Sequence, residues 1–278
     1  QRGTKVYYIE DLLTEILTNL DVKRNLINDI LIHSNIENHE LRELIFSYIF
    51  NKTPAEAAEI AIAGLNKKDI QDVDREYSLS DYIRKDYPLY INPIPNLYFM
   101  RDPLSIIGNG ISINSMQTNA RRREPMLIKY IYDYNPLFRK EYSQVWYNYT
   151  IPHSIEGGDI LVLSKEVVAV GCSERTSANG IEILARNLFA GNKDVKEVLA
   201  VHIPPLRAFM HLDTVFTMVD RDKFTVYPGI LDRVDVYRLT PDSSNGIKVT
   251  PENDLVGALK KSLKLPAVSL IQSGGGDT

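Results

Sequence analysis

Two short segments set charged side chains into apolar surroundings, where ionisable groups are rare. His211 and Asp213 stand two residues apart in the run FMHLDTVFTMVD, residues 209–220. We predict that this run is a buried strand, so that both side chains point to one face of a sheet. A buried carboxylate is costly unless it is paired. Two interpretations stay open: a structural His–Asp pair, or an acid/base histidine beside a carboxylate that binds a cation.

Glu156 is the charged residue of the second segment, SIEGGDILVL (residues 154–163), which places it directly before an apolar run. It is either an exposed turn glutamate or a carboxylate that lines a cavity.

A third acid, Asp102, lies in the loop NLYFMRDP, residues 96–103. Asp before Pro is also common turn chemistry, so this segment alone is a weak signal. Arginines follow two of the acids at one interval of 19 residues, from 102 to 121 and from 156 to 175. We therefore expect separate parts of the chain each to supply one acid and one arginine to a shared site.

Three carboxylates, a histidine and two arginines suit a ligand with a cationic and an anionic end. Carboxylates hold a planar cation in bidentate fashion, and arginines hold a carboxylate. A free amino acid with a guanidinium side chain fits this pattern. The run Arg121–Arg123 is the chain's only basic run and is typical of a solvated face.

The elements that must position these residues fall into two regions with different sequence patterns. Residues from about 9 to 80 carry apolar side chains at helical spacing and are predicted to form a cluster of short helices. Thr53 is predicted to cap one of them, with Pro54 in the first turn and Glu56 completing a capping box. After Pro88 the sequence turns to glycines, prolines and alternating strands.

The second half contains a repeat of strand, strand, helix and strand. The first copy is DILVLSKEVVAVG, a helix at about 177–189, and VKEVLAVHIP. The second copy is DTVFTMVD, KFTVYP, a connecting segment, the helix in ENDLVGALKKSLK, and AVSLIQSG. Such modules predict an α/β fold, and in a ring they would converge on a central cavity.

Bulk properties exclude several classes of function. The net charge of −4 and the short basic run argue against nucleic acid as a partner. No apolar stretch reaches the roughly 18 residues that a membrane span needs. The single cysteine, Cys172, excludes an internal disulfide and is compatible with a reducing cytoplasm, where we expect the protein.

The motifs NLYFMRDP, ARRRE (120–124), SIEGGD and FMHLDTVFTM, with GCSERT (171–176) and SGGGD (273–277), resemble the arginine deiminases of the guanidine-modifying superfamily. The resemblance covers nearly the whole chain. It implies a pseudo-fivefold α/β propeller of ββαβ modules, incomplete here, with an inserted all-α helical subdomain. The implied division is 1–8 as a remnant of the first module, 9–84 as the helical insertion and 85–278 as the incomplete catalytic propeller.

The resemblance also implies an activity, the hydrolysis of L-arginine to L-citrulline and ammonia, the first step of anaerobic arginine catabolism. It implies no metal and no cofactor. Asp102 and Asp213 would grip the guanidinium, Glu156 would help to move protons, and His211 would act as general acid and then as general base. The remaining implied substrate-binding residues are Asn96, Phe99, Arg121 and Arg175.

The chain departs from the family pattern in its nucleophile. The family uses a cysteine in a segment ending Cys-Met-Ser-Met-Pro near the C-terminus, which is not found in these 278 residues. The first strand of the first module is also missing. Cys172 does not match, and we expect it to be buried filler. We therefore expect this chain alone to be inactive, and its incomplete ring to favour association into a homo-oligomer.

Three alternatives remain beside a piece of an arginine deiminase. One is a non-catalytic paralogue that binds arginine. Another is a different guanidine-modifying enzyme. The last is a metal hydrolase that uses Asp102, Glu156, His211 and Asp213, a donor set that favours a hard ion over zinc.

Overall fold

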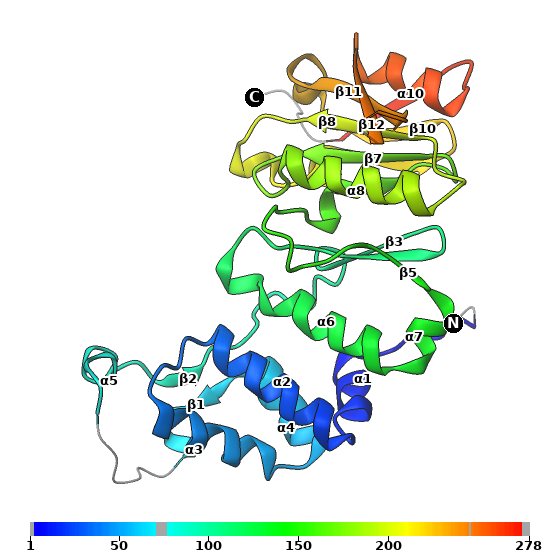
Figure 1. Ribbon diagram of the computed structural model, residues 1–278. Helices are drawn as coiled ribbons and strands as arrows, with labels where there is room; N and C mark the ends of the chain where they lie inside the picture. The colour runs from blue at the N-terminus through cyan, green and yellow to red at the C-terminus, as the bar shows by residue number, and fades with distance from the viewer. Residues whose placement is uncertain (1–2, 71–76, 245, 274–278) are drawn as a thin grey trace. The chain divides into compact units, whose positions relative to one another are not determined.

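The computed structural model describes residues 3–70, 77–244 and 246–273, and the chain divides into two compact units (Figure 1). The first unit consists of Gln1–Tyr98 and Met126–Glu141, and the second of Phe99–Pro125 and Tyr142–Thr278. Apart from Ser273, the SGGGD motif lies outside the described residues.

The first unit is mainly helical, as its apolar periodicity predicts. A short antiparallel pair of strands accompanies the helices. Its elements are α1 (Ile9–Ile16), α2 (Leu20–His33), α3 (His39–Phe50), α4 (Pro54–Ala63), β1 (Leu65–Asn66), α5 (Leu79–Ile83), β2 (Leu89–Ile91), most of α6 (Arg123–Tyr134) and α7 (Pro136–Glu141).

The start of α4 shows why these helices begin where they do. The Thr53 hydroxyl accepts a hydrogen bond from the Glu56 backbone N–H, and the Glu56 carboxylate accepts one from the Thr53 N–H. Pro54 occupies the first turn, where its missing N–H costs nothing. The predicted capping box is therefore confirmed.

Three sheets are formed by the described part of the second unit. One has the order β12-β11-β8-β7-β6, another β13-β10-β9, and the third β3-β4-β5. Their strands are β3 (Leu104–Ile107), β4 (Gly110–Ile113), β5 (Gln144–Tyr147), β6 (Ile160–Val162), β7 (Val167–Cys172), β8 (Glu197–His202), β9 (Phe216–Asp220), β10 (Lys223–Val226), β11 (Asp235–Asp242), β12 (Gly246–Glu252) and β13 (Ser269–Gln272). The helices of this unit are α8 (Ala178–Gly191), α9 (Leu212–Val215) and α10 (Leu255–Leu263).

The strand–strand–helix–strand repeat is present, and it occurs three times within the residues that the structure describes. In each copy two strands pair antiparallel, a helix follows in the chain, and the next strand of the copy pairs parallel to the second. The two predicted copies are β6-β7-α8-β8 and β9-β10-α10-β13, the second interrupted by the hairpin of β11 and β12. The copy that the sequence reading missed is β3-β4-α6-β5. The fold is therefore a mixed α/β fold built on one recurring module.

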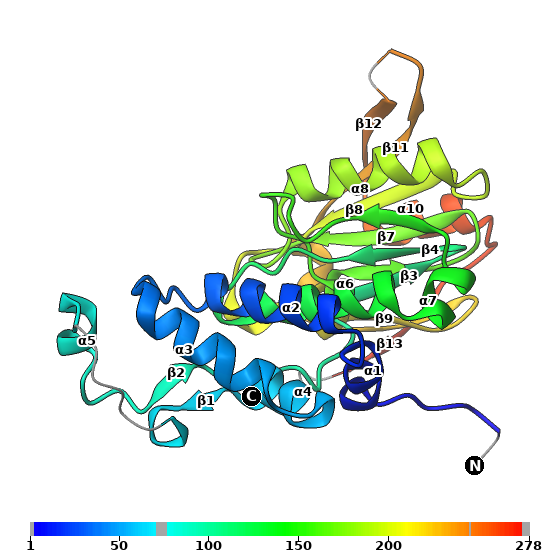
Figure 2. The same cartoon turned by 60° about the horizontal axis from the view of Figure 1, so that its bottom comes forward.

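The central strands β7 and β8 of the five-stranded sheet are buried on both faces. In β7, Val168 and Val170 belong to the core around α8, while Val167 and Ala169 belong to the core around β9, β10 and α10. Successive side chains of a strand point to opposite faces, so one apolar strand serves two cores. Figure 1 shows α8 lying along the sheet, and Figure 2 shows the hairpin of β11 and β12 extending beyond it.

The prediction of one strand over residues 209–220 is wrong. A short 3₁₀ helix covers Arg207–Phe209, His211 caps the single turn α9, and β9 begins only at Phe216. His211 and Asp213 are therefore not strand neighbours on one face. The continuous apolar run does not distinguish a buried turn of helix from a buried strand.

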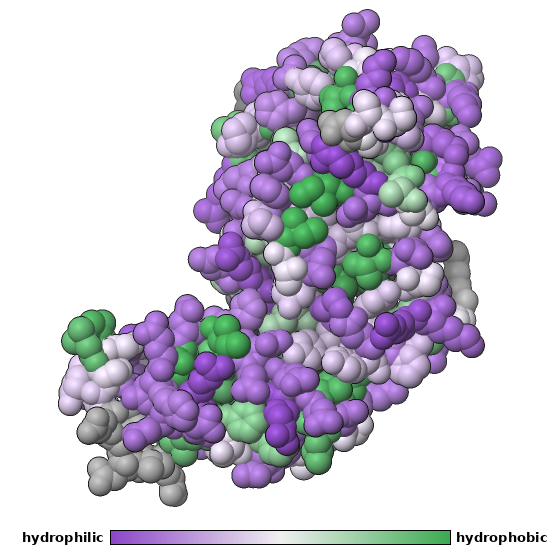
Figure 3. Space-filling view, viewed as in Figure 1, coloured by the Kyte–Doolittle hydropathy of each residue, from purple (hydrophilic) through white to green (hydrophobic). Residues whose placement is uncertain are grey.

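Apolar side chains are exposed on the surface of the first unit at α5, among other places. Figure 3 shows hydrophobic side chains at the tip that α5 forms in Figure 1. Leu79, Tyr82 and Ile83 are largely exposed there. In the part of the chain that the structure describes, no helix has both the length and the apolar character of a membrane span.

Candidate active site

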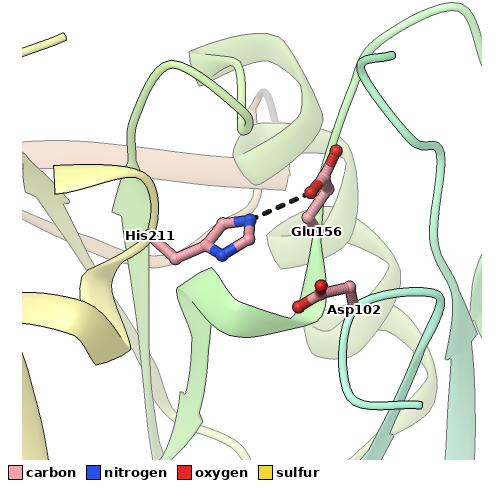
Figure 4. Close-up of side chains that lie close together, drawn as sticks. All are labelled: Asp102, Glu156 and His211. Carbon is pink, nitrogen blue, oxygen red and sulfur yellow. Dashed lines mark hydrogen bonds and ion pairs between the residues drawn. The ribbon is translucent and has the colours of Figure 1, made fainter. Parts of the chain in front are cut away.

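Asp102, Glu156 and His211 meet in the second unit, although they come from distant parts of the chain. Figure 4 shows the three side chains pointing toward one another. The His211 Nε2 atom lies 2.9 Å from the Glu156 Oε2 atom. One ligand atom of each of the three residues lies within 4.8 Å of the others. The predicted convergence of these residues is therefore found.

Glu156 is held by hydrogen bonds on three sides. Its Oε1 atom accepts from the Gln117 backbone N–H at 3.0 Å, and its own N–H donates to the Thr176 hydroxyl at 3.0 Å. The third bond is the one to His211. Only 1% of Glu156 is exposed, so the alternative of an exposed turn glutamate is wrong.

His211 is placed by its backbone and by a glycine. It is the N-cap residue of α9, and 5% of it is exposed. Its ring lies against Gly158, where an added Cβ would come within 2.6 Å of the His211 Nδ1 atom. Burial lowers the pKa of the imidazole. The hydrogen bond to Glu156 and the charges of Asp159, Glu156 and Asp102 outweigh burial and raise it overall. The ring is thus favoured in its protonated form.

Asp102 is paired with an arginine of the chain. The Arg121 Nη1 atom donates to the Asp102 Oδ2 atom at 2.7 Å and lies 3.9 Å from the Glu156 Oε2 atom. The other edge of the guanidinium forms two bonds with Glu124, at 2.8 and 2.7 Å. Burial raises the pKa of Glu124 although Arg121 opposes that change.

Arg121 and Arg123 correct another expectation. Two of the three residues of the basic run, Arg121 and Arg123, are buried, with 7% and 8% exposed, and Arg122 is exposed, so the run as a whole is not a solvated face. The pKa of the Arg121 guanidinium is raised, because its carboxylate partners outweigh burial. Arg121 is therefore a fixed positive charge among the acids of the site.

Asp213 has an arginine partner as well. The Arg101 Nε atom lies 3.0 Å from the Asp213 Oδ2 atom, and the Arg101 Nη2 group donates to the Ile160 carbonyl at 3.3 Å. Burial raises the pKa of Asp213, while the charges of Arg101 and His211 oppose that change. The sequence places Arg101 in the same polar loop as Asp102, but no role in the site was predicted for it.

The other predicted binding residues, Arg175, Phe99 and Asn96, differ in their surroundings. The backbone N–H of Arg175 donates to the Ser173 hydroxyl at 3.0 Å. Its Nε atom is buried and forms no hydrogen bond within the described residues. Phe99 is 49% exposed in the loop before Asp102. Asn96 belongs to the first unit, so its role beside these side chains stays a prediction.

Asp159 is a buried acid that the sequence reading passed over. It is fully buried and accepts hydrogen bonds from the Ser173 hydroxyl (2.7 Å), the Thr176 hydroxyl (2.6 Å) and the Leu212 N–H (2.8 Å). Burial raises its pKa to about 6, against these hydrogen bonds and the charge of His211. The signal was available, because Asp159 directly precedes the apolar strand β6.

Cys172 does not have the surroundings of a reactive thiol. It ends β7, partly buried against the core around α8. Burial and the charge of Asp159 raise the pKa of the thiol, whereas a reactive cysteine needs a lowered pKa.

The cluster of Asp102, Glu156 and His211 has the donor types of a hard-ion site. However, the Arg121 guanidinium already lies against two of the three residues. Its positive charge opposes a metal ion at the same place. The arrangement is therefore better suited to bind a planar organic cation and to move protons beside it.

Comparisons with known proteins agree with this chemistry. A family model described as arginine deiminase matches residues 1–278. The curated arginine deiminase of Bacillus cytotoxicus is 41% identical over 280 residues, which cover 99% of this chain and 68% of that protein. The arginine deiminase of Latilactobacillus sakei is 40% identical over 278 residues, with 99% and 68% covered.

Solved structures give weaker similarities. The N-terminal domain of ArgZ, a cyanobacterial arginine dihydrolase bound to product, has a TM-score of 0.44 and 14% identity, with 65% of this chain and 54% of that chain covered. DDAH from Pseudomonas aeruginosa in complex with citrulline has a TM-score of 0.40 and 16% identity, with 66% and 72% covered.

Proposed function

Because this chain belongs to the arginine deiminase family, we propose that it supplies the guanidinium-binding and proton-transfer groups for the hydrolysis of L-arginine to L-citrulline and ammonia. The observation that carries the proposal is the meeting of Asp102, Glu156 and His211 in one buried place. Arg121 lies there with its guanidinium against Asp102, so the cluster already binds a group of the substrate's chemistry.

Asp102 and Asp213 are the groups that we assign to the substrate guanidinium. Arg–carboxylate pairs are planar and often bidentate, so two carboxylates can fix the plane of the cation. Fixed orientation can lower the barrier by several kcal/mol, and by roughly 7–11 in the best intramolecular cases. The substrate cation would exchange with the resident arginines on these carboxylates.

We assign proton transfer to His211 and Glu156. A protonated imidazole can give its proton to the leaving nitrogen, so that neutral ammonia departs. The resulting neutral imidazole can then accept a proton from the hydrolytic water. Glu156, at 2.9 Å, stabilises the protonated state and keeps the ring in place.

The family resemblance implies a cysteine nucleophile that forms a covalent intermediate. We propose that Cys172 is not this nucleophile, because its surroundings raise the pKa of the thiol. Cys172 is the only cysteine in the 278 residues. We therefore expect the polypeptide of this sequence to bind L-arginine without sustained turnover by itself.

Arg175 is proposed to receive the α-carboxylate of the substrate, because its buried Nε–H has no acceptor among the described residues. An ionised ligand oxygen would satisfy that donor. For Arg121 the same role requires release from Asp102 and Glu124. Asn96 and Phe99 complete the proposed binding set from the family resemblance.

The recurrence of one module supports a larger architecture. We propose that the three modules belong to a pseudo-fivefold α/β propeller, with residues 9–84 as a helical insertion, 1–8 as a remnant of the first module and 85–278 as the propeller part. A homo-oligomer remains a proposal as well, to be tested by light scattering of the purified protein.

The function is tested by calorimetric titration of the chain with L-arginine. L-Lysine serves as the control ligand, because it keeps both charges but has no guanidinium. We expect binding of L-arginine and much weaker binding of L-lysine. Equal affinity for both, or no binding of either, would contradict the proposal. Because no sustained turnover is expected of this polypeptide, its affinity for L-arginine compared with its affinity for other guanidine compounds distinguishes a site for arginine from that of another guanidine-modifying enzyme.

A further inference from the structure

We propose that Asp159 is the positioning residue of this site: it ties the segments that carry Glu156 and His211 together and sets a negative charge behind the imidazole. The inference rests on the proposed function of these two residues. It concerns a side chain that lies behind them and does not itself grip the substrate.

The first part of the argument is how Asp159 reaches the histidine. Its Oδ1 atom accepts from the N–H of Leu212, the residue after His211, at 2.8 Å. This bond anchors the first turn of α9, for which His211 is the N-cap residue. A carboxylate at the start of a helix also satisfies an N–H that has no partner within the helix. The backbone that carries the imidazole is thus fixed directly by Asp159.

The second part is how Asp159 reaches the glutamate. Its Oδ2 atom accepts from the Thr176 hydroxyl at 2.6 Å, and the oxygen of this hydroxyl accepts from the Glu156 N–H at 3.0 Å. One hydroxyl therefore joins the carboxylate of Asp159 to the backbone of Glu156. The Ser173 hydroxyl donates to the same carboxylate and accepts from the N–H of Arg175. The loop with the proposed anion-binding arginine is thereby linked to the same group.

The third part is that the chain packs closely around Asp159 and His211 at two glycines. A Cβ added at Gly171 would lie 2.3 Å from the Asp159 Oδ1 atom, and one added at Gly158 would lie 2.6 Å from the His211 Nδ1 atom. Both glycines therefore allow close approach. Asp159 itself has no exposed surface, so its charge is screened little by water.

Three carboxylates, those of Glu156, Asp159 and Asp102, raise the pKa of the histidine, and the Asp213 carboxylate interacts with it as well. Cys172 is the further titratable group that interacts with Asp159. Because each of the three carboxylates favours the protonated ring, removal of the Asp159 charge must lower the pKa of His211. A role limited to packing would not change that pKa in a variant that keeps its shape.

The test is an NMR titration of the histidine side chains in the 278-residue chain, with His211 assigned by the His211→Gln variant. Asp159→Asn keeps the size of the side chain and an acceptor for the Leu212 N–H, but removes the charge. We expect the titration midpoint of His211 to fall in this variant. Asp222→Asn, at an exposed aspartate of the same unit, is the control and should leave the midpoint unchanged.

A second variant covers the case in which Asp159→Asn does not fold. Ser173→Ala removes one donor from the Asp159 carboxylate, which makes its ionisation harder, so the His211 midpoint should fall here as well. An unchanged midpoint in a folded variant of either kind would overturn the inference.

Titration with L-arginine separates this result from the proposed function. This titration is made on the original chain, because Asp159 also holds the Ser173 hydroxyl, which accepts from the N–H of Arg175. A midpoint shift in a chain that never binds L-arginine would reject the proposed function and leave the positioning role. Normal binding of L-arginine by the original chain, with no midpoint shift in the variants, would reject the positioning role and leave the proposed function.

Discussion

Two arginine side chains of the protein occupy the carboxylates that we assign to the substrate guanidinium. Arg121 lies on Asp102, and Arg101 lies on Asp213, so each carboxylate assigned to the substrate has a resident guanidinium. These pairs balance buried negative charge that would otherwise be costly. The two arginines differ in exposure, since 9% of the Arg121 side chain and 53% of the Arg101 side chain are exposed. Arg101 is therefore the easier one to displace.

The first prediction concerns Asp213→Asn. The change removes the charge that pairs with the guanidinium, and a charge-assisted hydrogen bond contributes roughly 1.5–3 kcal/mol. We expect the Kd for L-arginine to rise about 10- to 100-fold, measured by calorimetry at pH 7.5. Asp220→Asn is the matched control, because Asp220 also pairs with a basic residue, Lys223, but at the surface. Equal affinity of the Asp213→Asn variant and the original chain would remove Asp213 from the site.

The second prediction concerns Arg101→Gln. Burial raises the pKa of Asp213, and the Arg101 charge counteracts that rise. Without Arg101 the pKa of Asp213 rises further, so a larger fraction of the carboxyl is protonated and uncharged at mildly acidic pH. We expect L-arginine binding by the variant to weaken more steeply between pH 7.5 and pH 5.5 than binding by the original chain. Arg221→Gln is the control, and parallel pH profiles for all three chains would contradict the prediction.

At the scale of elements, the first unit has a buried lysine that donates hydrogen bonds to carbonyls at the C-terminal end of a helix. Lys23 on α2 is 3% exposed, and its ammonium donates to the carbonyls of Phe50, the last residue of α3, and Lys52. These carbonyls have no partner within the helix, and a cation there also interacts favourably with the helix dipole.

The third prediction follows from this contact. Lys23→Met keeps the length of the side chain but removes both hydrogen bonds and leaves the carbonyls unsatisfied. We expect a loss of about 2 kcal/mol in the free energy of unfolding, in line with unsatisfied buried polar groups. Urea denaturation followed by circular dichroism measures it, with Lys68→Met at an exposed position as the control. A variant as stable as the control would show that Lys23 is not structurally important.

The elements that the sequence predicts well are those with local signals. The cap formed by Thr53 and Glu56 and the apolar spacing of α1 to α4 depend on neighbours within a few residues. The turn α9 is different. It spans only Leu212–Val215 in an apolar run, and its first turn is fixed by Asp159, which lies far away in the sequence. No local pattern contains that information.

In the site as well, some features can be predicted from the sequence and others depend on contacts between distant residues. The types and spacing of Asp102, Glu156 and His211 predict their convergence. The sequence does not predict that Arg121 is bound to Glu124, or that Arg101 reaches Asp213, because both pairings depend on the final packing. Asp159 could have been found, since an acid next to a buried strand needs partners.

For the whole molecule, two buried groups shape the dependence of stability on pH. The pKa of Asp159 rises from 3.8 to about 6 in the folded chain, so the folded chain binds more protons between these values. The free energy of unfolding then falls as pH rises through this window. His211, whose pKa is also raised, contributes stability below its unfolded pKa of 6.5 that is lost as pH rises through the folded pKa. Both groups therefore favour the folded state on the acidic side of neutrality.

The fourth prediction is that the chain is more stable at pH 5 than at pH 7.5. The shift of Asp159 alone corresponds to about 3 kcal/mol as an upper value, at roughly 1.4 kcal/mol per pKa unit. Urea denaturation at the two pH values measures the difference. Asp159→Asn should reduce it, because the variant has no carboxyl to titrate. Greater stability at pH 7.5, or the same difference in the variant, would contradict this account.

The two apolar faces of β7 have a consequence for insertions and deletions. Removing one residue between Val167 and Cys172 would exchange the side chains that face the two cores. Since both faces are apolar, the sheet could still form. However, the segment after β7 would then leave the sheet on the opposite face. This segment carries Ser173, Arg175 and Thr176. Such a chain could remain folded and yet lose the arrangement of the proposed site, so the register of this strand is under tighter constraint than its composition.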